Sequence, residues 1–305
     1  MRPLLKWAGG KRQLLPELRR FYPKTFGRYI EPFVGSGAVF FDLYGTGRLD
    51  GHETILIDSN TDLIGCYEMV RDRTDEVLKS LEDLAERHAR QGRPHYYEVR
   101  DGQFNPIREQ GRRLDGSVLY TPQLAAMFIY LNRTGYNGLF RLNAAGGFNV
   151  PAGRYSRPTI CDRTHIEAIA EALSRSRARL VYGSFDRALE FAGAEDFLYI
   201  DPPYAPLSAT SSFTAYTQAK FDDSAQRRVQ TMVVALAERG CAVVVSNSSA
   251  VAPLYGENRA ARDAGIRVWR VPARRAINAR ADRRGQIEEL VISNLRQAPS
   301  TQTSC

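Results

Sequence analysis

The sequence predicts an α/β protein in which a doubly wound, mostly parallel sheet carries a mostly helical insertion. Short apolar strand patterns occur within the first sixty residues and again after about residue 180, and helical patterns separate them. Strands that alternate with helices form parallel sheets with helices on both faces. The stretch between the two groups instead contains amphipathic helical patterns, which indicates a separate, inserted unit.

The first group of patterns predicts two strands. Residues 28–44, RYIEPFVGSGAVFFDLY, are typical of a strand, a glycine turn and a helix. Residues 53–60, ETILIDSN, predict a second buried strand that ends in Asp58. Both runs are short, apolar and bounded by turn residues, as buried strands are.

The insertion is expected over residues 61–162. Residues 74–91 form an amphipathic pattern whose apolar face holds Val77, Leu78, Leu81 and Leu84. Residues 120–132, YTPQLAAMFIYLN, predict another helix. Residues 134–155, TGYNGLFRLNAAGGFNVPAGRY, alternate around Gly146-Gly147 and so predict a β-hairpin.

The second group completes the sheet. Its strand patterns are RLVYGSF, DFLYID and CAVVVSN, and a closing antiparallel pair is predicted from IRVWRVPAR and IEELVISNL. A helix precedes CAVVVSN, with Gly240 placed to end it and apolar residues at Val229, Met232, Val233 and Leu236. Residues 1–60 and 163–295 are therefore expected to form one discontinuous domain around the insertion, followed by a disordered tail over 296–305.

Composition narrows the classes of partner. The chain has 305 residues, with 42 Lys and Arg against 34 Asp and Glu, so its formal charge is +8. This excess suits a polyanionic partner, although many basic proteins bind no nucleic acid. RTGYNGLFR and RVPARRAINARADRR interleave arginine with aromatic or turn residues, which suits phosphate and base contacts better than a solvated face does. For the second stretch, a hairpin with a charged exterior stays open as an alternative.

Cysteine spacing and hydropathy argue against zinc-binding, disulfide-rich and membrane-spanning classes of protein. The four cysteines are scattered without a CxxC pair, which argues against a zinc site or a disulfide scaffold and fits a reducing cytoplasm. No apolar run approaches the length of a membrane span. The sequence also offers no cluster of metal ligands.

Two glycines and an acid suggest a nucleotide-like ligand. Gly35-Ser36-Gly37 lies between a predicted strand and helix, where missing Cβ atoms let a ligand approach the backbone. The third glycine of a dinucleotide fingerprint is absent, so this signal is weak alone. Asp58, at the end of the next strand, suits ribose hydroxyls and equally suits a helix cap.

LLKWAGGKRQLL, near the N-terminus, adds an aromatic ring and a cation. Trp7 and Lys11 flank a Gly-Gly turn, an arrangement that suits stacking on an adenine ring. Without further context, Trp7 is more often a core residue and Lys11 a surface charge.

The strand-end sequence Asp201-Pro202-Pro203-Tyr204 is the most specific signal. Proline fixes φ and removes a backbone donor, so the turn keeps carbonyl acceptors facing outward. The Asp201 carboxylate and the Pro202 carbonyl can each accept a hydrogen bond from an exocyclic amine, while Tyr204 offers a face for a base. Such an amine is hidden in a duplex, so the base must first be flipped out. A rigid turn with an aromatic plug is the less favoured reading.

Taken in order, these blocks resemble the Dam-type DNA adenine methylases of the α group of adenine-N6 methyltransferases. The resemblance covers nearly the whole chain, and its most specific blocks are NRTGYNGLFRLNAAGGFNVPAGRY and DPPYAPLSATSSFTAY. It implies a Rossmann-like methyltransferase sheet, with residues 61–162 as the target-recognition domain. It also implies S-adenosyl-L-methionine as methyl donor, held by Trp7, Lys11, Asp58 and Asp201, with Glu31, Gly35 and Gly37 of the EPFVGSG loop around its methionine part.

The resemblance further implies a site-specific enzyme that methylates adenine N6 within GATC in double-stranded DNA. An intercalating Tyr136, a phosphate-binding Asn137, a wedge at Leu139 and a guanine-reading Arg141 carry over to the predicted hairpin, with Arg154 as a further DNA contact. Asp201, Pro202 and Tyr204 are the catalytic set. A monomeric, cytoplasmic and nucleoid-associated enzyme without metal is expected, transferring the methyl group directly and in line.

Two alternatives stay open from the sequence. A methyltransferase of similar core can act on another amine, such as cytosine N4, RNA or a protein glutamine; the intact GYNGLFR block speaks against it. A catalytically silent DNA-binding module would need a broken cofactor or acceptor motif, and both motifs are intact.

Overall fold

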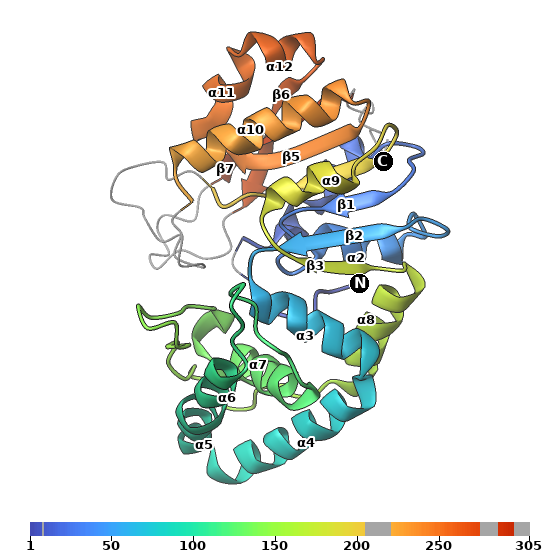
Figure 1. Ribbon diagram of the computed structural model, residues 1–305. Coiled ribbons are helices and arrows are strands. Elements are labelled where there is room, and N and C mark those ends of the chain that lie inside the picture. Colours follow the sequence, from blue (N-terminus) through green and yellow to red (C-terminus); the bar gives the residue numbers. More distant parts are fainter. Residues whose placement is uncertain (8, 205–220, 275–285, 296–305) are drawn as a thin grey trace.

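The computed structural model describes residues 1–7, 9–204, 221–274 and 286–295 of the chain (Figure 1). Its centre is one sheet of seven strands in the order β3-β2-β1-β4-β5-β7-β6. The strands are β1 (Tyr29–Glu31), β2 (Thr54–Asp58), β3 (Arg179–Tyr182), β4 (Phe197–Ile200), β5 (Ala242–Ser248), β6 (Arg267–Arg274) and β7 (Gln286–Ser293).

The strand order places a topological switch point at the centre of the sheet. Strands β1 to β5 run parallel, and β1 lies between β2 and β4, with Ile30 level with Ile55 on one side and Leu198 on the other. Strand β7 pairs antiparallel with β5, and β6 antiparallel with β7. The predicted parallel sheet and closing antiparallel pair are confirmed. In open sheets of this type, ligands bind beyond the carboxyl ends of the strands at the switch point.

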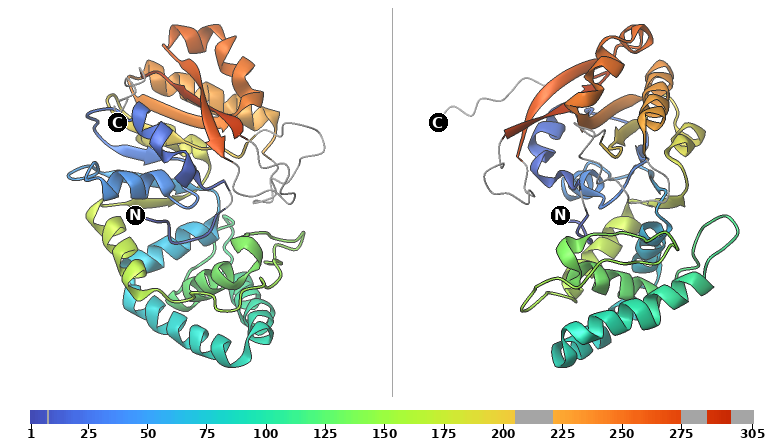
Figure 2. Two further views of the ribbon diagram at one scale, coloured as in Figure 1. Left: turned by 180° about the vertical axis from the view of Figure 1, so that it is seen from behind. Right: turned by 90° about the vertical axis from the view of Figure 1, so that its left-hand side faces the viewer.

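Helices cover both faces of the sheet, as the two views in Figure 2 show. One apolar core includes residues of α2 and α8, and a second one, on the other face, includes residues of α9, α10 and α11. The helices are α1 (Leu15–Leu18), α2 (Ala38–Gly45), α3 (Thr61–Asp72), α4 (Thr74–Gln91), α5 (Arg93–Tyr97), α6 (Asn105–Gln110), α7 (Pro122–Thr134), α8 (Arg163–Arg175), α9 (Ala188–Phe191), α10 (Asp223–Glu238), α11 (Ala252–Gly256) and α12 (Arg259–Asp263).

Helices α3 to α7 form the inserted unit below the sheet in Figure 1. Helix α7 is its centre and is buried over most of its length. Asn132 on α7 ties this unit to the N-terminal segment: the backbone N–H of Lys6 donates to Asn132 Oδ1 at 2.8 Å, and Asn132 Nδ2 donates to the Lys6 carbonyl at 2.8 Å. The predicted helices are thus found, while the exact boundaries of the insertion stay a prediction.

The predicted hairpin around Gly146-Gly147 is present in a reduced form. Residues 141–149, called here the 141–149 hairpin, are joined by a single antiparallel bridge, Leu142 to Phe148, with no extended strands. Side chains replace further strand pairing: Asn105 on α6 donates through Nδ2 to the Phe148 carbonyl at 3.0 Å and accepts from the Phe148 N–H at 2.8 Å. An amide side chain thus satisfies the edge groups that another strand would otherwise satisfy.

Several predicted features lie outside the described residues: the loop from 205, the basic stretch from 275 and the tail over 296–305. Among the residues that are described, no helix is both long and apolar enough to cross a membrane.

Candidate active site

The chemically distinctive side chains gather at the carboxyl ends of the central strands. Glu31 is the last residue of β1, Asp58 the last of β2, and Asp201 directly follows β4. Because β2, β1 and β4 are neighbours and parallel, these three carboxyl groups come to the same edge of the sheet. The edge is the one that the switch point predicts.

Asp201 is held by a lysine and a serine. Lys11 Nζ lies 3.1 Å from Asp201 Oδ1, and the Lys11 side chain is only 7% exposed. Ser246 Oγ, from β5, donates to the same Oδ1 at 2.9 Å. Burial raises the pKa of Asp201, and Lys11 and Ser246 act against that shift by favouring the carboxylate. A buried ammonium thus balances a half-buried carboxylate at the end of β4.

Tyr204 is fixed next to this pair. Its hydroxyl donates to Glu289 Oε2 on β7 at 2.7 Å, and Lys11 Nζ lies 4.3 Å from the centre of its ring. The preceding carbonyl, of Pro203, accepts from Gln226 Nε2 at 2.8 Å. Pro202 is buried. The strand-end turn is therefore anchored at its carboxylate, at one carbonyl and at the tip of its aromatic ring.

The glycine loop is tied to Asp58. The Gly35 N–H donates to Asp58 Oδ2 at 3.0 Å, and the Asn60 N–H donates to Oδ1 at 2.9 Å. Gly35 and Gly37 have φ of 47° and 67°, a left-handed conformation that glycine adopts without strain. A Cβ on Gly35 would lie 3.1 Å from Cδ1 of Trp7, so the indole lies directly against the loop. Trp7, Asp58 and the loop therefore form one structural unit.

The helix-cap reading of Asp58 is wrong. Asn60 is the residue that caps α3: its Oδ1 accepts from the N–H groups of Asp62 at 3.0 Å and of Leu63 at 3.2 Å. The carboxylate of Asp58 instead receives the backbone of the glycine loop. Burial raises the pKa of Asp58 to about 6, against the hydrogen bonds from Gly35 and Asn60.

Glu31 is the most deeply buried acid at this edge, with 2% of its surface exposed. Tyr29 donates to its Oε2 at 2.8 Å. Burial raises the pKa of Glu31 well above its ordinary value, and the nearby Asp201 and Asp58 raise it further, while the Tyr29 hydroxyl lowers it. Burial thus raises the pKa of all three acids at this edge, and a cation bound beside them would favour their charged forms.

The residues expected to contact DNA lie on the inserted unit. Tyr136 is 51% exposed, and Asn137, also exposed, has φ of 54°. Leu139 is half-buried against the core. Arg141 is exposed, and its Nε donates to Asn149 Oδ1 across the 141–149 hairpin at 2.8 Å. Arg154 is exposed as well.

Trp7 also connects the two groups of residues. Its ring stacks on Phe140, beside Arg141 in the chain, with ring centres 5.8 Å apart. Phe140 packs in turn on Phe128 and Phe148. The glycine loop and the 141–149 hairpin therefore share one aromatic contact, although they are about a hundred residues apart in the sequence.

Sequence reasoning missed several members of this site. Ser246, Glu289 and Tyr199, whose hydroxyl lies 2.8 Å from Ser246 Oγ, complete the surroundings of Asp201 and Tyr204. Asn60 Nδ2 is buried without a hydrogen-bond partner next to Asp58. A signal existed for Ser246, which lies within the VVVSN block at the end of a strand. None existed for Glu289, which reaches the site only through the antiparallel pairing of β7 with β5.

Similarity to known proteins agrees with this geometry. The family model for the D12 class N6 adenine-specific DNA methyltransferases matches residues 7–264. The type II methyltransferase M1.LlaDCHI of Lactococcus lactis subsp. cremoris is 36% identical over 96% of this chain and 95% of its own length. The type II methyltransferase M.MjaIII of Methanocaldococcus jannaschii is also 36% identical, over 96% of this chain and 99% of its own.

A third relative, the DNA adenine methylase of Escherichia coli strain K12, is 35% identical over 95% of this chain and 94% of its own length. Among solved structures, the rRNA methyltransferase aviRa of Streptomyces viridochromogenes has a TM-score of 0.33 and 14% identity, too low to support any conclusion. The family match covers most of the chain, including the glycine loop, the hairpin and the strand-end Asp201. This chain belongs to the D12 class of N6 adenine-specific DNA methyltransferases.

Proposed function

We propose that the enzyme uses S-adenosyl-L-methionine to methylate adenine N6 within GATC in duplex DNA. The observation that carries the proposal is the arrangement around Asp201: its carboxylate is paired with Lys11 and lies beside the anchored Tyr204. The same strand edge presents Asp58 and the glycine loop. The hydrogen-bond acceptor for an amine, Asp201, and the nucleoside-binding residues, Asp58 and the glycine loop, thus lie at one edge of the sheet.

The residues at this edge fit a cationic nucleoside. Asp58 accepts the backbone N–H groups of Gly35 and Asn60, and the backbone of Ser59 also stabilises its charge; a carboxylate has about four acceptor positions, so capacity for a ribose hydroxyl is left. Asn60 Nδ2 is a buried donor without a partner, which a ligand group can satisfy. The three acids with raised pKa favour a positive charge nearby, and Trp7 provides an aromatic face. S-adenosyl-L-methionine, when bound, supplies an electrophilic methyl group on a positively charged sulfur.

Asp201 and Tyr204 are assigned to the adenine. Lys11 and Ser246 both contact Oδ1 of Asp201, and we assign Oδ2 to the amine. A hydrogen bond from N6 to this oxygen directs the nitrogen lone pair away from the ring and toward the methyl group. The new C–N bond would form as the C–S bond breaks, with the neutral thioether as leaving group, and the surplus N6 proton would pass to Oδ2 of Asp201 and from there to solvent. Tyr204 stacks on the flipped base, and its bond to Glu289 keeps the ring in place.

Sequence recognition is assigned to the exposed side chains of the inserted unit. Arg141 has the fork geometry that donates two hydrogen bonds to O6 and N7 of guanine, and it is oriented by Asn149. Tyr136 is a large exposed ring on the turn that follows α7, suited to filling the stack when adenine leaves it. Asn137, Leu139 and Arg154 complete this surface, as the resemblance of the GYNGLFR block implies.

The test is Asp201→Ala, with Asp263→Ala as the matched control. Asp263 is an exposed acid on α12, far from the strand edge. We expect the Asp201 variant to lose transfer of radiolabelled methyl groups to GATC duplexes and the control to keep it. Methylated plasmid from the wild type should resist GATC nucleases that methylation blocks, and calorimetry should detect S-adenosyl-L-methionine binding without DNA. Near wild-type transfer by Asp201→Ala would reject the catalytic assignment, and unprotected GATC sites would reject the recognition sequence.

A further inference from the structure

The connection between α6 and α7 forms a second ordered turn. Residues 112–118, called here the 112–118 turn, are closed by an antiparallel bridge between Arg112 and Val118. The Arg113 N–H donates to the Ser117 carbonyl at 2.8 Å. Asp115 Oδ1 accepts from the N–H and the hydroxyl of Ser117 at 2.9 and 2.6 Å. Figure 2, right, shows this connection extending away from the helices. Its own hydrogen bonds therefore fix its shape, and a Cβ on Gly116 at its tip would lie 3.3 Å from the hydroxyl of Tyr182, the last residue of β3.

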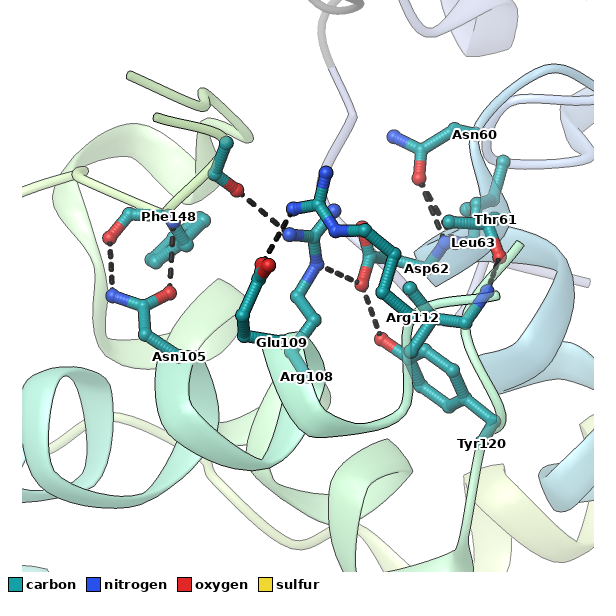
Figure 3. Close-up of polar contacts among 12 residues, drawn as sticks. Asn60, Thr61, Asp62, Leu63, Asn105, Arg108, Glu109, Arg112, Tyr120 and Phe148 are labelled. Atoms are coloured by element: carbon teal, nitrogen blue, oxygen red, sulfur yellow. Dashed lines mark hydrogen bonds and ion pairs between the residues drawn. The ribbon is translucent and has the colours of Figure 1, made fainter. Parts of the chain in front are cut away.

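The base of the turn is bound to the start of α3, the helix that follows β2. The Val118 N–H donates to Thr61 Oγ1 at 2.9 Å, and the Tyr120 hydroxyl donates to Asp62 Oδ1 at 3.0 Å (Figure 3). Thr61 and Asp62 begin α3, just after Asp58. The turn is thus held at a constant position relative to the active-site edge.

The turn also lies next to the 141–149 hairpin. Arg108, at the end of α6, donates to Asp62 Oδ1 at 2.7 Å and to the Gly146 carbonyl at 2.7 Å. Arg112 packs on the same glycine, where a Cβ would lie 2.7 Å from its Nη2. The 112–118 turn and the proposed guanine-reading hairpin therefore share one frame and form a continuous surface.

The side chains that this turn presents are basic and apolar. Leu114 is fully exposed, with a relative exposure of 110%, and Leu119 is 55% exposed. Arg112 and Arg113 are exposed on the same turn. The turn also carries one exposed acid, Asp115, which bonds Ser117, so its two arginines leave a net charge of +1. Arg112 pairs with Glu109 of α6 at 2.7 Å. Single exposed leucines are common, but Leu114 on the turn and Leu119 directly after it lie beside the proposed DNA-reading hairpin and form a contact surface with Arg113.

We propose that the 112–118 turn is a second DNA-binding element that contacts the duplex outside the target sequence. Arg113 binds a phosphate of the flanking backbone, and Leu114 packs on the sugar edges next to it. The proposal rests on the proposed function, since it uses the same duplex. The turn and the 141–149 hairpin form one surface, and a duplex bound to the hairpin continues past the target on both sides. Each of its strands carries a phosphate about every 3.4 Å. A basic turn fixed beside the reading hairpin meets that backbone.

The test compares duplex lengths. Arg113→Ala and Leu114→Ser are measured against Arg259→Ala, whose arginine is exposed on α12. Dissociation constants are determined for duplexes with one central GATC and about 8 to about 24 base pairs. We expect each turn variant to bind the longest duplex several-fold more weakly than the control does, and to bind the shortest equally well. The salt slope of Arg113→Ala on the longest duplex should fall by about one, because one phosphate contact is lost.

Three outcomes would overturn the proposal. Equal affinities of the turn variants and the control at every length would exclude a flanking contact. A loss of the same size on the shortest and longest duplexes would place the turn inside the target sequence. The wild type could sediment as a dimer while Leu114→Ser sediments as a monomer with unchanged DNA affinity. That result would assign Leu114 to a contact with a second copy of the chain. Methylation of the GATC duplex by the wild type tests the proposed function separately in every case.

Discussion

Replacing Arg108 by alanine should destabilise the protein far more than removing a surface arginine. The side chains of Arg108 and Asp62 are 6% and 1% exposed, and they pair at 2.7 Å. Arg108→Ala leaves the Asp62 carboxylate buried, with the Tyr120 hydroxyl as its remaining side-chain donor, and removes the bond to the Gly146 carbonyl. Breaking a buried pair by removing one partner costs about 3–5 kcal/mol. With an m-value of about 3 kcal/mol/M, the urea midpoint should fall by about 1–1.7 M.

The assay is urea unfolding of Arg108→Ala, Asp62→Ala, the double variant and Arg259→Ala. The pair Arg259–Asp263 has exposed side chains, so its loss should not move the midpoint measurably. The double variant buries no unpaired charge, and we expect it to be more stable than the sum of the single losses predicts, by about 3 kcal/mol. If Arg108→Ala unfolds at the midpoint of the surface control, or if the two single losses simply add, the buried-pair reasoning is refuted.

Three further outcomes are expected. Arg141→Ala should relax the preference for GATC over sites changed at one guanine by about 1–3 kcal/mol, measured as the ratio of kcat/KM values, and an unchanged ratio would exclude guanine reading. Affinity for S-adenosyl-L-methionine should fall as the pH drops through about 6, because Asp58, whose pKa is raised to about 6, then takes up a proton and accepts ribose hydroxyls less well. The free energy of unfolding should instead rise over the same pH range, because the folded state binds that proton more tightly than the unfolded state does. An affinity that does not depend on pH would contradict this role of Asp58. Gly138→Ala should lower Tm more than Gly51→Ala does. Both glycines have positive φ, 62° and 80°, but only a Cβ on Gly138 would clash, at 2.3 Å from Lys6. Equal losses of Tm would show that the backbone conformation alone decides the cost.

The strands could be predicted because their signals are local. TILID of β2 and the Ala242–Val245 run of β5 are apolar, and both strands are buried over most of their length. The helix that ends before Gly240 was predicted equally well, because its apolar period and its terminating glycine are both written in the sequence. Residues such as Asp201, Asp58 and Gly35 could be selected because each stands at the end of a strand, where ligands of such sheets bind.

The hairpin shows where local signals are insufficient. Alternation around Gly146-Gly147 predicts two paired strands, but the chain forms two isolated bridges, Gly135 to Ala152 and Leu142 to Phe148. Strand length depends on neighbours that satisfy the edge groups, and here that neighbour is the side chain of Asn105. The 112–118 turn was not predicted at all, because its bridge is short and its anchors, Thr61 and Asp62, belong to another element.

The sequence by itself determined the strand and helix elements, the strand-end acids and the family resemblance, because these depend on residues close together in the chain. Tertiary structure alone decided which groups meet: Lys11 and Ser246 on Asp201, and Glu289 on Tyr204. These partners come from distant segments that the strand order β1-β4-β5-β7 brings side by side. Burial at that edge then raises the pKa of the acids, and burial is a property of the folded chain that no short stretch of sequence contains.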